Sequence, residues 1–383
     1  MKEEKVNKSG EENRMAYEID FISVKESESK QDADAIALRW KDGDSYKIVI
    51  YDGGLQAHGE KLQDHLNSYY FQENQEKIID AIIVSHSDQD HTSGLKIILE
   101  NFSVKALYMN RPWIYAKELY DNDEIKVQDG RITENSLEDR LRKKYSYIDD
   151  LEKIAEEKDI PIYETFEGEV IEDVFTVLSP SKEFYLNLIV ESDKTPIEKY
   201  SYRGSLYEFS QKISKYIKKK LEAWNVETLR ENVSTSAENE MSVVIYGKLS
   251  EEGILLVGDA GLRALNYAND YAADNDISLK NEVNVMQIPH HGGRHNVSPS
   301  LLDKLIGKRV KQGETTGKRA YVCAADNSDH PLQMVINAYV RRGVKVYTAK
   351  GNTINHHRNM PERSGWTTVD NLSFDPNVEE WDE

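Results

Sequence analysis

The pattern of apolar and polar positions predicts a group of strands, followed by strands and helices in alternation. Residues 16–25 (AYEIDFISVK) and 34–40 (DAIALRW) alternate as half-buried strands do, and 46–54 (YKIVIYDGG) predicts a third strand ending in an Asp-Gly turn. These three strands indicate an antiparallel meander. The next predicted elements are a helix over 58–74, a fully apolar strand over 78–86, a helix over 92–102 and a strand over 104–110.

The second half of the chain repeats this alternation after a charged helical stretch at 134–158 and short strands over 161–181. Because strands and helices alternate in both halves, the sequence predicts a layered α/β fold. The later strands are expected at 241–249, 253–261, 283–293, 319–326 and 344–351, and the helices between them at 262–273, 298–307 and 331–343.

Residues 182–232 differ from the segments on either side. They contain a Lys- and Tyr-rich, helix-like block at 207–229 between polar segments, which predicts an insertion lying on the fold. The charged residues 1–15 predict a mobile arm, and the acidic residues 356–383 predict a loosely held tail. The folded domain is therefore expected to span 16–355.

The composition narrows the class of protein. With 383 residues the chain can bury a large core, and its 39% hydrophobic and 31% charged residues are typical of a soluble protein. No apolar run approaches the roughly 18 residues of a membrane helix, so we expect a cytoplasmic protein without membrane contact. The single cysteine, Cys323, excludes a disulfide within the chain and is expected to be a buried, inert thiol.

A net charge of −19 disfavours extended, nonspecific binding of nucleic acid by this chain alone. An anionic substrate would need a locally positive site.

The stretch SHSDQDHTSGL places His86, Asp88, Asp90 and His91 directly after an apolar strand. As the backbone curls away from the sheet it can direct several of these side chains to one point. Imidazoles and carboxylates are ligands for Zn, Mn or Fe. A solvated turn would normally use Asp, Asn, Ser or Gly and would not need two histidines. The stretch therefore predicts a metal site.

Two later strand ends carry side chains of the same kind. Asp259 follows the strand in LLVGDAG, and His290 and His291 follow the strand in IPHHGG. Alone, Asp259 would more often be a turn or helix-cap residue. Since three strand ends carry metal-type ligands, we expect them to share one site at the carboxyl edge of a sheet.

The order and spacing of these motifs resemble those of the metallo-β-lactamase superfamily. More narrowly, SHSDQDHTSGL, VLSP, NEMSVVIYG, LLVGDAG, IPHHGG and DNSDHP with VKVYTAKGNTI resemble, in that order, the soluble hydrolase domain of the competence DNA-uptake protein ComEC and its free-standing relatives. The resemblance spans about 16–355 without the insertion at 182–232. It implies an αββα four-layer sandwich of two mixed sheets with flanking helices.

The resemblance also implies a ligand set, carried over residue by residue. His86 and Asp88 would hold one metal ion, a second would be held by Asp90, His91 and His290, and Asp259 would bridge the two. Because the histidine is doubled, His291 is the alternative to His290. Two further positions match the family only in a supporting role: Asp52, expected to hydrogen-bond the histidines of the first motif, and Asp34, in KQDADA where the family has G-x-G-D.

This chain departs from the commonest family pattern at the first metal. The family has a third histidine there, but no histidine occurs between positions 92 and 289. The loop AENEMS takes its place, which makes Glu238 or Asn239 a candidate substitute. A site with one imidazole and several oxygens favours Mn²⁺ over the usual zinc. We therefore expect one or two divalent ions, Zn or Mn.

These expected ligands predict a metal-dependent hydrolase that uses a metal-activated water, with Asp90 or His330 as the proton donor to the leaving group. The leading hypothesis is a phosphodiesterase or nuclease acting on single-stranded DNA or an oligonucleotide. One alternative is a hydrolase of small esters, lactones or cyclic nucleotides. Another is a component of a multi-protein system, such as phage defence, that docks a partner through 182–232. His356 and His357 are expected to be surface residues.

Overall fold

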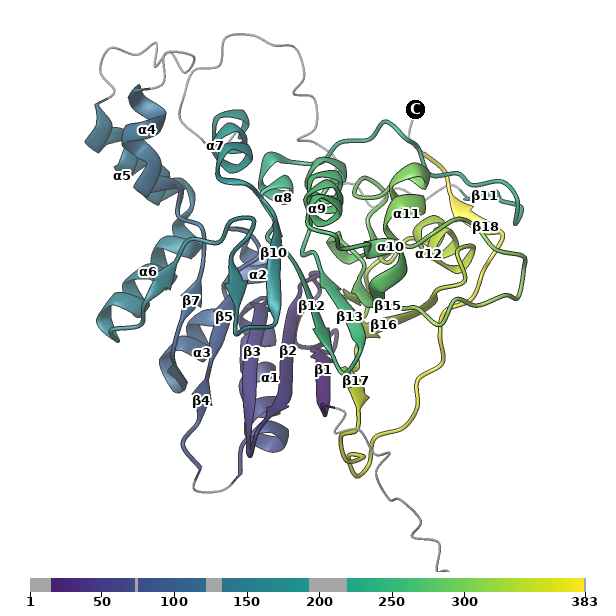
Figure 1. Ribbon diagram of the computed structural model, residues 1–383, viewed down its shortest axis with the longest axis horizontal. Helices are drawn as coiled ribbons and strands as arrows, with labels where there is room; N and C mark the ends of the chain where they lie inside the picture. Colours follow the sequence, from purple (N-terminus) through teal and green to yellow (C-terminus); the bar gives the residue numbers. More distant parts are fainter. Residues whose placement is uncertain (1–14, 73–74, 122–132, 193–218, 382–383) are drawn as a thin grey trace, which may run out of the picture.

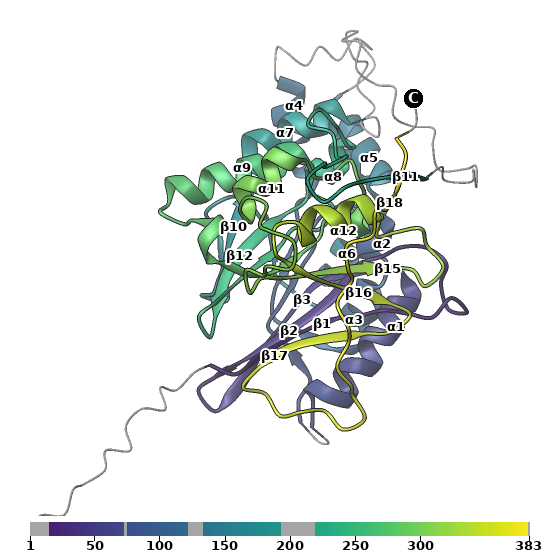
Figure 2. The ribbon, with the colours of Figure 1, turned by 90° about the vertical axis from the view of Figure 1, so that its right-hand side faces the viewer.

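The structure is a computed structural model that describes residues 15–72, 75–121, 133–192 and 219–381. Two seven-stranded sheets pack face to face, with strand orders β17-β1-β2-β3-β5-β7-β8 and β16-β15-β14-β13-β12-β10-β9. Figure 2 shows helices α1 and α3 on the outer side of the first sheet and α9, α11 and α12 on the outer side of the second. This is the predicted αββα four-layer sandwich, the metallo-β-lactamase fold.

The strands are as follows. The first sheet contains β1 (Tyr17–Phe21), β2 (Ala35–Asp42), β3 (Ser45–Gly53), β5 (Ala81–Ile83), β7 (Leu107–Tyr108), β8 (Ile162–Tyr163) and β17 (Ile354–Arg358). The second contains β9 (Val170–Ile171), β10 (Phe175–Ser179), β12 (Val244–Leu249), β13 (Glu252–Leu256), β14 (Val283–Gln287), β15 (Arg319–Ala324) and β16 (Lys345–Lys350). Two small pairs join β4 (Ile78–Ile79) to β6 (Ser103–Val104) and β11 (Lys219–Leu221) to β18 (Asn377–Glu379).

The helices, labelled in Figure 1, are α1 (Gln56–His65), α2 (Gln89–Thr92), α3 (Leu95–Asn101), α4 (Ala116–Asp121), α5 (Glu134–Lys144), α6 (Ser146–Glu157), α7 (Lys182–Glu191), α8 (Ala237–Glu240), α9 (Leu262–Asp274), α10 (Leu279–Glu282), α11 (Pro299–Leu305) and α12 (Gln333–Val340). A π-helical turn, η1 (Leu66–Tyr70), extends α1, and two short 3₁₀ turns are η2 (Pro112–Tyr115) and η3 (His290–Gly292).

The predicted meander is present, but β1 is not half-buried. Strands β1, β2 and β3 pair antiparallel, with Ile19 opposite Leu38. All five residues of β1 are buried, because helices cover one face of the sheet and the second sheet covers the other. Its polar positions are paired: Arg363 donates to Asp20 at 2.8 Å, and Arg39 contacts Glu18 at 2.5 Å. The alternation of polar and apolar residues predicted a half-buried strand, but the polar side chains of β1 also lie on a buried face.

The core between the two sheets is apolar and aromatic. Phe21 of the first sheet stacks on Tyr321 of the second with ring centroids 4.7 Å apart, and Trp40 meets Phe175 edge-on at 5.8 Å. Cys323 is buried in this core, as predicted, and burial raises the pKa of its thiol well above the usual value. The contacts fix the two sheets relative to each other, and therefore also the strand ends that carry the polar motifs.

Four predictions about the second half are wrong. Residues 219–221 form strand β11, not part of a helix, and they pair with β18 at residues 377–379, so the expected loose tail is packed on the fold. Strand β17 crosses position 355, and its His356 is buried with 6% exposure because it lies between the sheets; His357 is exposed as predicted. Residues 222–229 of the Lys-rich block form no helix either, and residues 207–218 lie outside the described residues.

The parallel strands bring the polar motifs to one edge. In the first sheet β3, β5 and β7 run parallel, and in the second sheet β13, β14, β15 and β16 do. The loops after β5, β13 and β14 carry the three motifs. Gly258, with φ +52°, allows a close approach, since a Cβ there would lie 2.7 Å from the Cβ of Ser85. Gly292, with φ +84°, does the same against Pro331 at 2.5 Å.

Among the described residues, no helix is both long and apolar enough to cross a membrane.

Candidate metal centre

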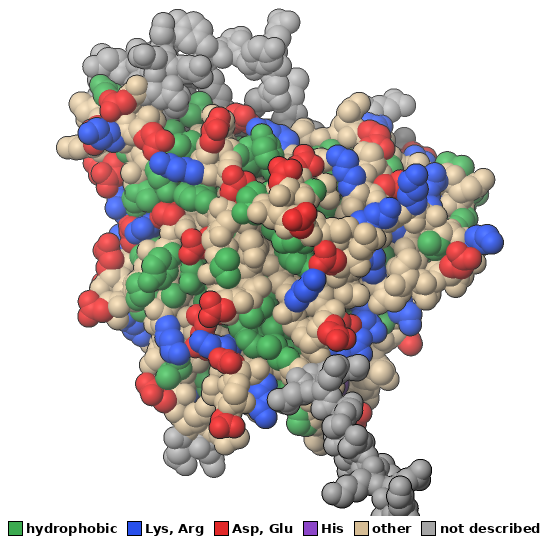
Figure 3. Space-filling view, in the orientation of Figure 1, with side chains coloured by type: hydrophobic (Ala, Val, Ile, Leu, Met, Phe, Trp, Pro, Cys, Tyr) green, Lys and Arg blue, Asp and Glu red, His purple; other side chains and the backbone are tan. Residues whose placement is uncertain are grey.

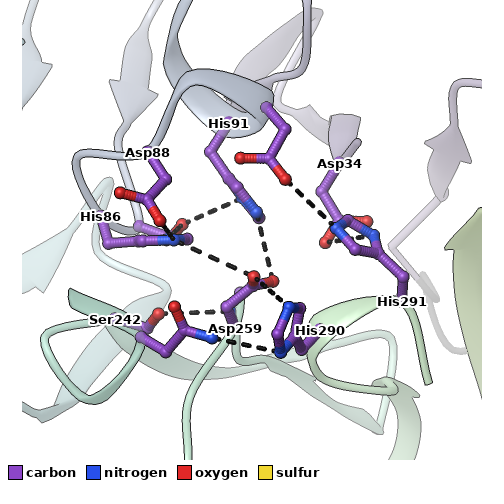
Figure 4. A network of polar contacts seen from close by, with 12 residues as sticks. Asp34, His86, Asp88, His91, Ser242, Asp259, His290 and His291 are labelled. Carbon is purple, nitrogen blue, oxygen red and sulfur yellow. Dashed lines mark hydrogen bonds and ion pairs between the residues drawn. The ribbon is translucent and has the colours of Figure 1, made fainter. Parts of the chain in front are cut away.

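The residues from the three strand ends meet around Asp259. Figure 4 shows its carboxylate at the centre, with His91, His86 and His290 directed toward it from different sides. Nε2 of His91 lies 3.2 Å from Oδ1 of Asp259. Nε2 of His86 and Nε2 of His290 lie 4.0 and 3.6 Å from the other oxygen, Oδ2. The two oxygens therefore face different imidazoles.

The remaining predicted ligands lie beside this group. Nε2 of His291 is 3.5 Å from Oδ2 of Asp90, and Nε2 of His86 is 3.8 Å from Oδ2 of Asp88. Both Asp88 and Asp90 are partly exposed, with side chains 30% and 34% accessible, so the group opens to solvent on the side of the first motif.

Each of the four histidines has its Nδ1 atom engaged away from Asp259. The partners are Ser85 Oγ for His86 at 3.0 Å, Asp52 Oδ2 for His91 at 2.8 Å, Asn296 Oδ1 for His290 at 2.9 Å and the Cys323 carbonyl for His291 at 3.1 Å. A carboxylate and a carbonyl only accept, so Nδ1 of His91 and of His291 must donate. Nε2 is then the atom available to a metal, the arrangement typical of metal-binding histidines.

Several atoms that face one another in this group have no hydrogen bond. Within the described part of the chain, Nε2 of His86, His91 and His291 and Oδ1 of Asp259 are buried and lack a hydrogen-bond partner. Buried polar atoms are normally satisfied, so four such atoms in one place suit the binding of a cation. The donor types, imidazole and carboxylate, suit Zn²⁺ or Mn²⁺. The residues present therefore fit a divalent metal.

Asp34 belongs to the same group. One ligand atom each from Asp34, His91, Asp259 and His291 lies within 4.8 Å of the others, and all four residues are buried. Asp34 also accepts a hydrogen bond from Gln287 at 3.0 Å and lies 3.8 Å from Nδ1 of His291. It can hold that imidazole in place or add a carboxylate to the second ion.

The carboxylates and imidazoles shift one another's pKa values. Burial opposes charge on Asp259, but His290 and His91 hold the pKa of its carboxyl well below the usual value. Burial likewise disfavours a charged His91, but Asp259 and Asp52 raise its pKa well above the usual value. At His291 burial lowers the pKa of the imidazole, but Asp34 and Asp90 outweigh this effect and raise it to about 10. Protons thus occupy the positions a dication would take, and metal binding would release them.

The backbone is strained at the site. Asp52, His290 and His291 have φ angles of 59°, 49° and 54°, in the left-handed region that non-glycine residues rarely adopt. Such conformations persist where the surrounding structure enforces them, and they gather at functional sites. Asp52 uses its position to accept from the Ser85 amide at 2.7 Å while holding His91, the supporting role expected of it.

The two candidate substitutes for the missing third histidine are engaged elsewhere. Glu238 accepts a hydrogen bond from Ser192. Ser236 caps the turn that contains Asn239 and donates to its Oδ1 at 2.7 Å, and Nδ2 of Asn239 lies 3.1 Å from Nδ1 of His290. Both side chains are buried beside the site, where one carboxylate oxygen of Glu238 and the amide oxygen of Asn239 already accept hydrogen bonds.

His330 lies at the rim of the site. Its ring centroid is 6.5 Å from that of His290, and its Nδ1 lies 2.8 Å from Oδ2 of Asp32. Sequence reasoning missed Asp32, although it stands two positions before Asp34 in KQDADA. It also missed Asn296 and Gln287, whose partners in space are 6 and 253 residues away along the chain. No local pattern marks an amide that acts over such separations.

Comparison with known proteins agrees with the fold. Residues 43–178 match the model of the metallo-beta-lactamase superfamily. Among solved structures, the metallo-beta-lactamase fold protein YhfI from Bacillus subtilis is 8% identical, with 90% of this chain and 100% of that chain covered and a TM-score of 0.38. Unliganded yeast PDE1 is 11% identical, with 88% and 99% covered and a TM-score of 0.41. Scores this low carry no information about a substrate. No curated protein sequence matches the chain.

The four-layer fold agrees with the match of residues 43–178 to the family model, and the buried group of Asp34, His91, Asp259 and His291 could hold a divalent metal ion.

Proposed function

We propose that this chain is a metal-dependent phosphodiesterase, in the simplest case a nuclease acting on single strands or short oligonucleotides. The observation that carries the metal-dependent part is the set of buried, unpartnered Nε2 atoms of His86, His91 and His291 around the Asp259 carboxylate. The phosphodiester part is supported by the ordered motif resemblance to the ComEC hydrolase domain.

The metal would be held by His86, Asp88, Asp90, His91, Asp259 and the His290–His291 pair. Divalent ions bound there supply a nucleophilic water at neutral pH and stabilise negative charge on the substrate. The chain contributes the orientation: Asp52 and the Cys323 carbonyl hold two of the imidazoles by their Nδ1 atoms, so that both present Nε2.

His330 is the proton donor in this proposal. Because the Asp32 carboxylate accepts from its Nδ1, the proton for the leaving group would come from Nε2 of the doubly protonated ring, which returns to the neutral form with Nδ1 still donating to Asp32. The side chain is 30% exposed, so it can meet a leaving group without a rearrangement of the fold. Asp90, the other candidate, is instead directed at His291, and that imidazole with His91 lowers the pKa of its carboxyl to about 2 despite burial. At neutral pH it would have no proton to give.

The net charge limits the kind of phosphodiester. A chain of −19 repels a long polyanion, and on the face shown in Figure 3 acidic and basic side chains are interspersed, not gathered into a basic track. Long duplex DNA would need such a track for its phosphates. A short or single-stranded substrate, contacted mainly at the metal ions, fits this surface better.

Purified protein loaded with Mn²⁺ or Zn²⁺ should cleave bis(p-nitrophenyl) phosphate and single-stranded DNA. Asp259→Asn and Asp90→Asn should each lower kcat/KM on the order of 100-fold or more, since each removes charge stabilisation from the reacting centre. Asp274→Asn, at the exposed end of α9, is the matched control and should leave the rate unchanged. Cleavage that survives both site substitutions would refute the metal mechanism. Turnover of lactones or carboxylic esters without any phosphodiester cleavage would refute the substrate class.

A further inference from the structure

The doubled histidine offers a way to complete the first metal site. This inference rests on the proposed metal centre but concerns only which residues hold which ion. The first motif supplies His86 and Asp88 to one ion, and the chain has no histidine at positions 92–289 to join them. From the sequence alone, His290 and His291 are alternatives for a single position at the other ion. The structure directs both of them into the site.

The distances to Asp259 separate the two histidines. Nε2 of His290 lies 3.6 Å from Oδ2, the same oxygen that faces Nε2 of His86. His91 faces the other oxygen, Oδ1, at 3.2 Å. His291 instead reaches Asp90, the ligand expected at the ion of His91. Each oxygen of the bridging carboxylate thus has its own histidines.

The hydrogen bonds of His290 favour a free Nε2. Asn296 donates through Nδ2 to the carbonyl of Asp259 at 2.7 Å, which fixes its amide so that Oδ1 is the atom 2.9 Å from Nδ1 of His290. That oxygen can only accept, so Nδ1 carries the proton and Nε2 the lone pair. The Nδ2 atom of Asn239 is 3.1 Å from the same Nδ1, and a rotation of that amide by half a turn would present its oxygen to the same proton.

The backbone explains how neighbouring residues reach different ions. Both His290 and His291 are left-handed, with φ of 49° and 54°, inside the turn η3. Successive side chains in such a turn project in different directions, whereas one of two neighbours in a strand would point away from the site. Strain at two consecutive non-glycine residues is more than one ligand would require.

The separations also suit two sets of ligands. Tetrahedral donors at about 2.1 Å from an ion lie about 3.4 Å apart. The donor pairs in the first set are 3.6 to 4.0 Å apart, and those in the second are 3.2 and 3.5 Å apart. The side chains of the first set would have to move closer together to close on an ion, whereas His91, Asp259 and His291 of the second already lie, with Asp34, in a group whose ligand atoms are within 4.8 Å of one another.

We propose that His290 takes the place of the missing third histidine, so that His86, Asp88, Asp259 and His290 bind one ion while Asp90, His91, Asp259 and His291 bind the other. Each ion then has two imidazoles. The chain would bind two ions of the same type with similar affinity, and neither ion would be held much more weakly than the other.

Pairwise removal of ligands tests this assignment without substrate. The full chain is stripped with chelator and titrated with Co²⁺, following d–d absorption and bound metal by mass spectrometry. His290→Gly and His291→Gly are used because glycine accepts positive φ, so the imidazole is removed without added strain. Each substitution should lower the affinity for one of the two Co²⁺ ions by about 100-fold or more and change the affinity for the other by only a few fold. His357→Gly, on an exposed histidine, is the control.

The decisive comparison combines each change with Asp88→Ala. If His290 shares an ion with Asp88, Asp88→Ala/His290→Gly keeps one Co²⁺ per chain, while Asp88→Ala/His291→Gly keeps none. The opposite result, a single ion in the unaltered chain, or two ions retained in His290→Gly would overturn the assignment. Should a glycine variant fail to fold by circular dichroism, His290→Asn and His291→Asn replace the pair. Two bound ions without phosphodiester cleavage would refute the proposed function and leave this assignment standing.

Discussion

Strand β13 has a carboxylate near each end, the half-buried Glu252 and the buried Asp259, and the two have different surroundings. At its first residue Glu252 is surrounded by donors: Arg358 contacts it at 2.8 and 2.6 Å, His356 at 3.2 Å, and Tyr17 also donates to it. Three residues beyond its other end, Asp259 faces histidines whose Nε2 atoms have no hydrogen bond. Both groups combine carboxylate and imidazole, and both carboxyls have a depressed pKa.

The difference shows what distinguishes a metal centre from a structural cluster. The pairing of carboxylate with imidazole and the depressed pKa of the carboxyl are common to both groups and do not separate the two. The hydrogen bonds of the histidines separate them. At Glu252 both ring nitrogens of His356 have a partner, with Nδ1 3.0 Å from the hydroxyl of Tyr321. At Asp259 the histidines use Nδ1 for a hydrogen bond, as His291 does, and keep Nε2 for a metal. A closed cluster stabilises the fold by itself. An open one gains its stability only when a cation completes it.

The largest effect should come from metal acting on the open cluster. At about 1,000 times its Kd, an ion bound only by the folded chain adds about 4 kcal/mol to the free energy of unfolding. Asp259→Asn should lose most of this gain, and Glu252→Gln should keep all of it. Thermal unfolding with excess Mn²⁺ or Zn²⁺ and with chelator measures the difference. An equal gain in the unaltered chain and in Asp259→Asn would mean that the ion binds elsewhere.

The closed cluster should respond to substitution without regard to metal. Glu252→Gln keeps the shape of the side chain but leaves Arg358 and His356 without their charged acceptor, which should lower the free energy of unfolding by about 2 kcal/mol. The same loss is expected with metal and with chelator, measured by urea unfolding. Asp274→Asn serves as the control, with a change below about 0.5 kcal/mol. If the loss of stability in Glu252→Gln disappeared when metal is chelated, the clusters at the two ends of β13 would be coupled and the comparison would fail.

The strand ends that carry ligands could be predicted from the sequence, because an apolar run followed by His and Asp is a local pattern. The alternation of strands and helices predicted a layered α/β fold, and the resemblance to the metallo-β-lactamase superfamily implied its four layers. The proposed assignment of His290 to one ion and His291 to the other could not be predicted from the sequence, because it depends on two positive φ angles and on Asn296. The burial of His356 was also missed. Its strand β17 pairs with β1 at the other end of the chain, and no local signal marks that pairing.

Acid should remove the contribution of Glu252, and this is the smallest of the expected effects. Burial opposes its charge, but Arg358, His356 and Tyr17 hold its pKa below the ordinary value of 4.5. A group with a depressed folded pKa stabilises the fold above its unfolded pKa, and that stability is lost as the pH falls toward the folded pKa. The gap in stability between the unaltered chain and Glu252→Gln should therefore be constant from pH 6 to 8 and narrow below about pH 4.5. Urea unfolding with chelator, at a series of pH values, measures the gap free of metal. A gap that widens in acid would mean that the carboxyl of Glu252 is held protonated in the folded chain, and that the cluster is closed by a neutral hydrogen bond and not by charge.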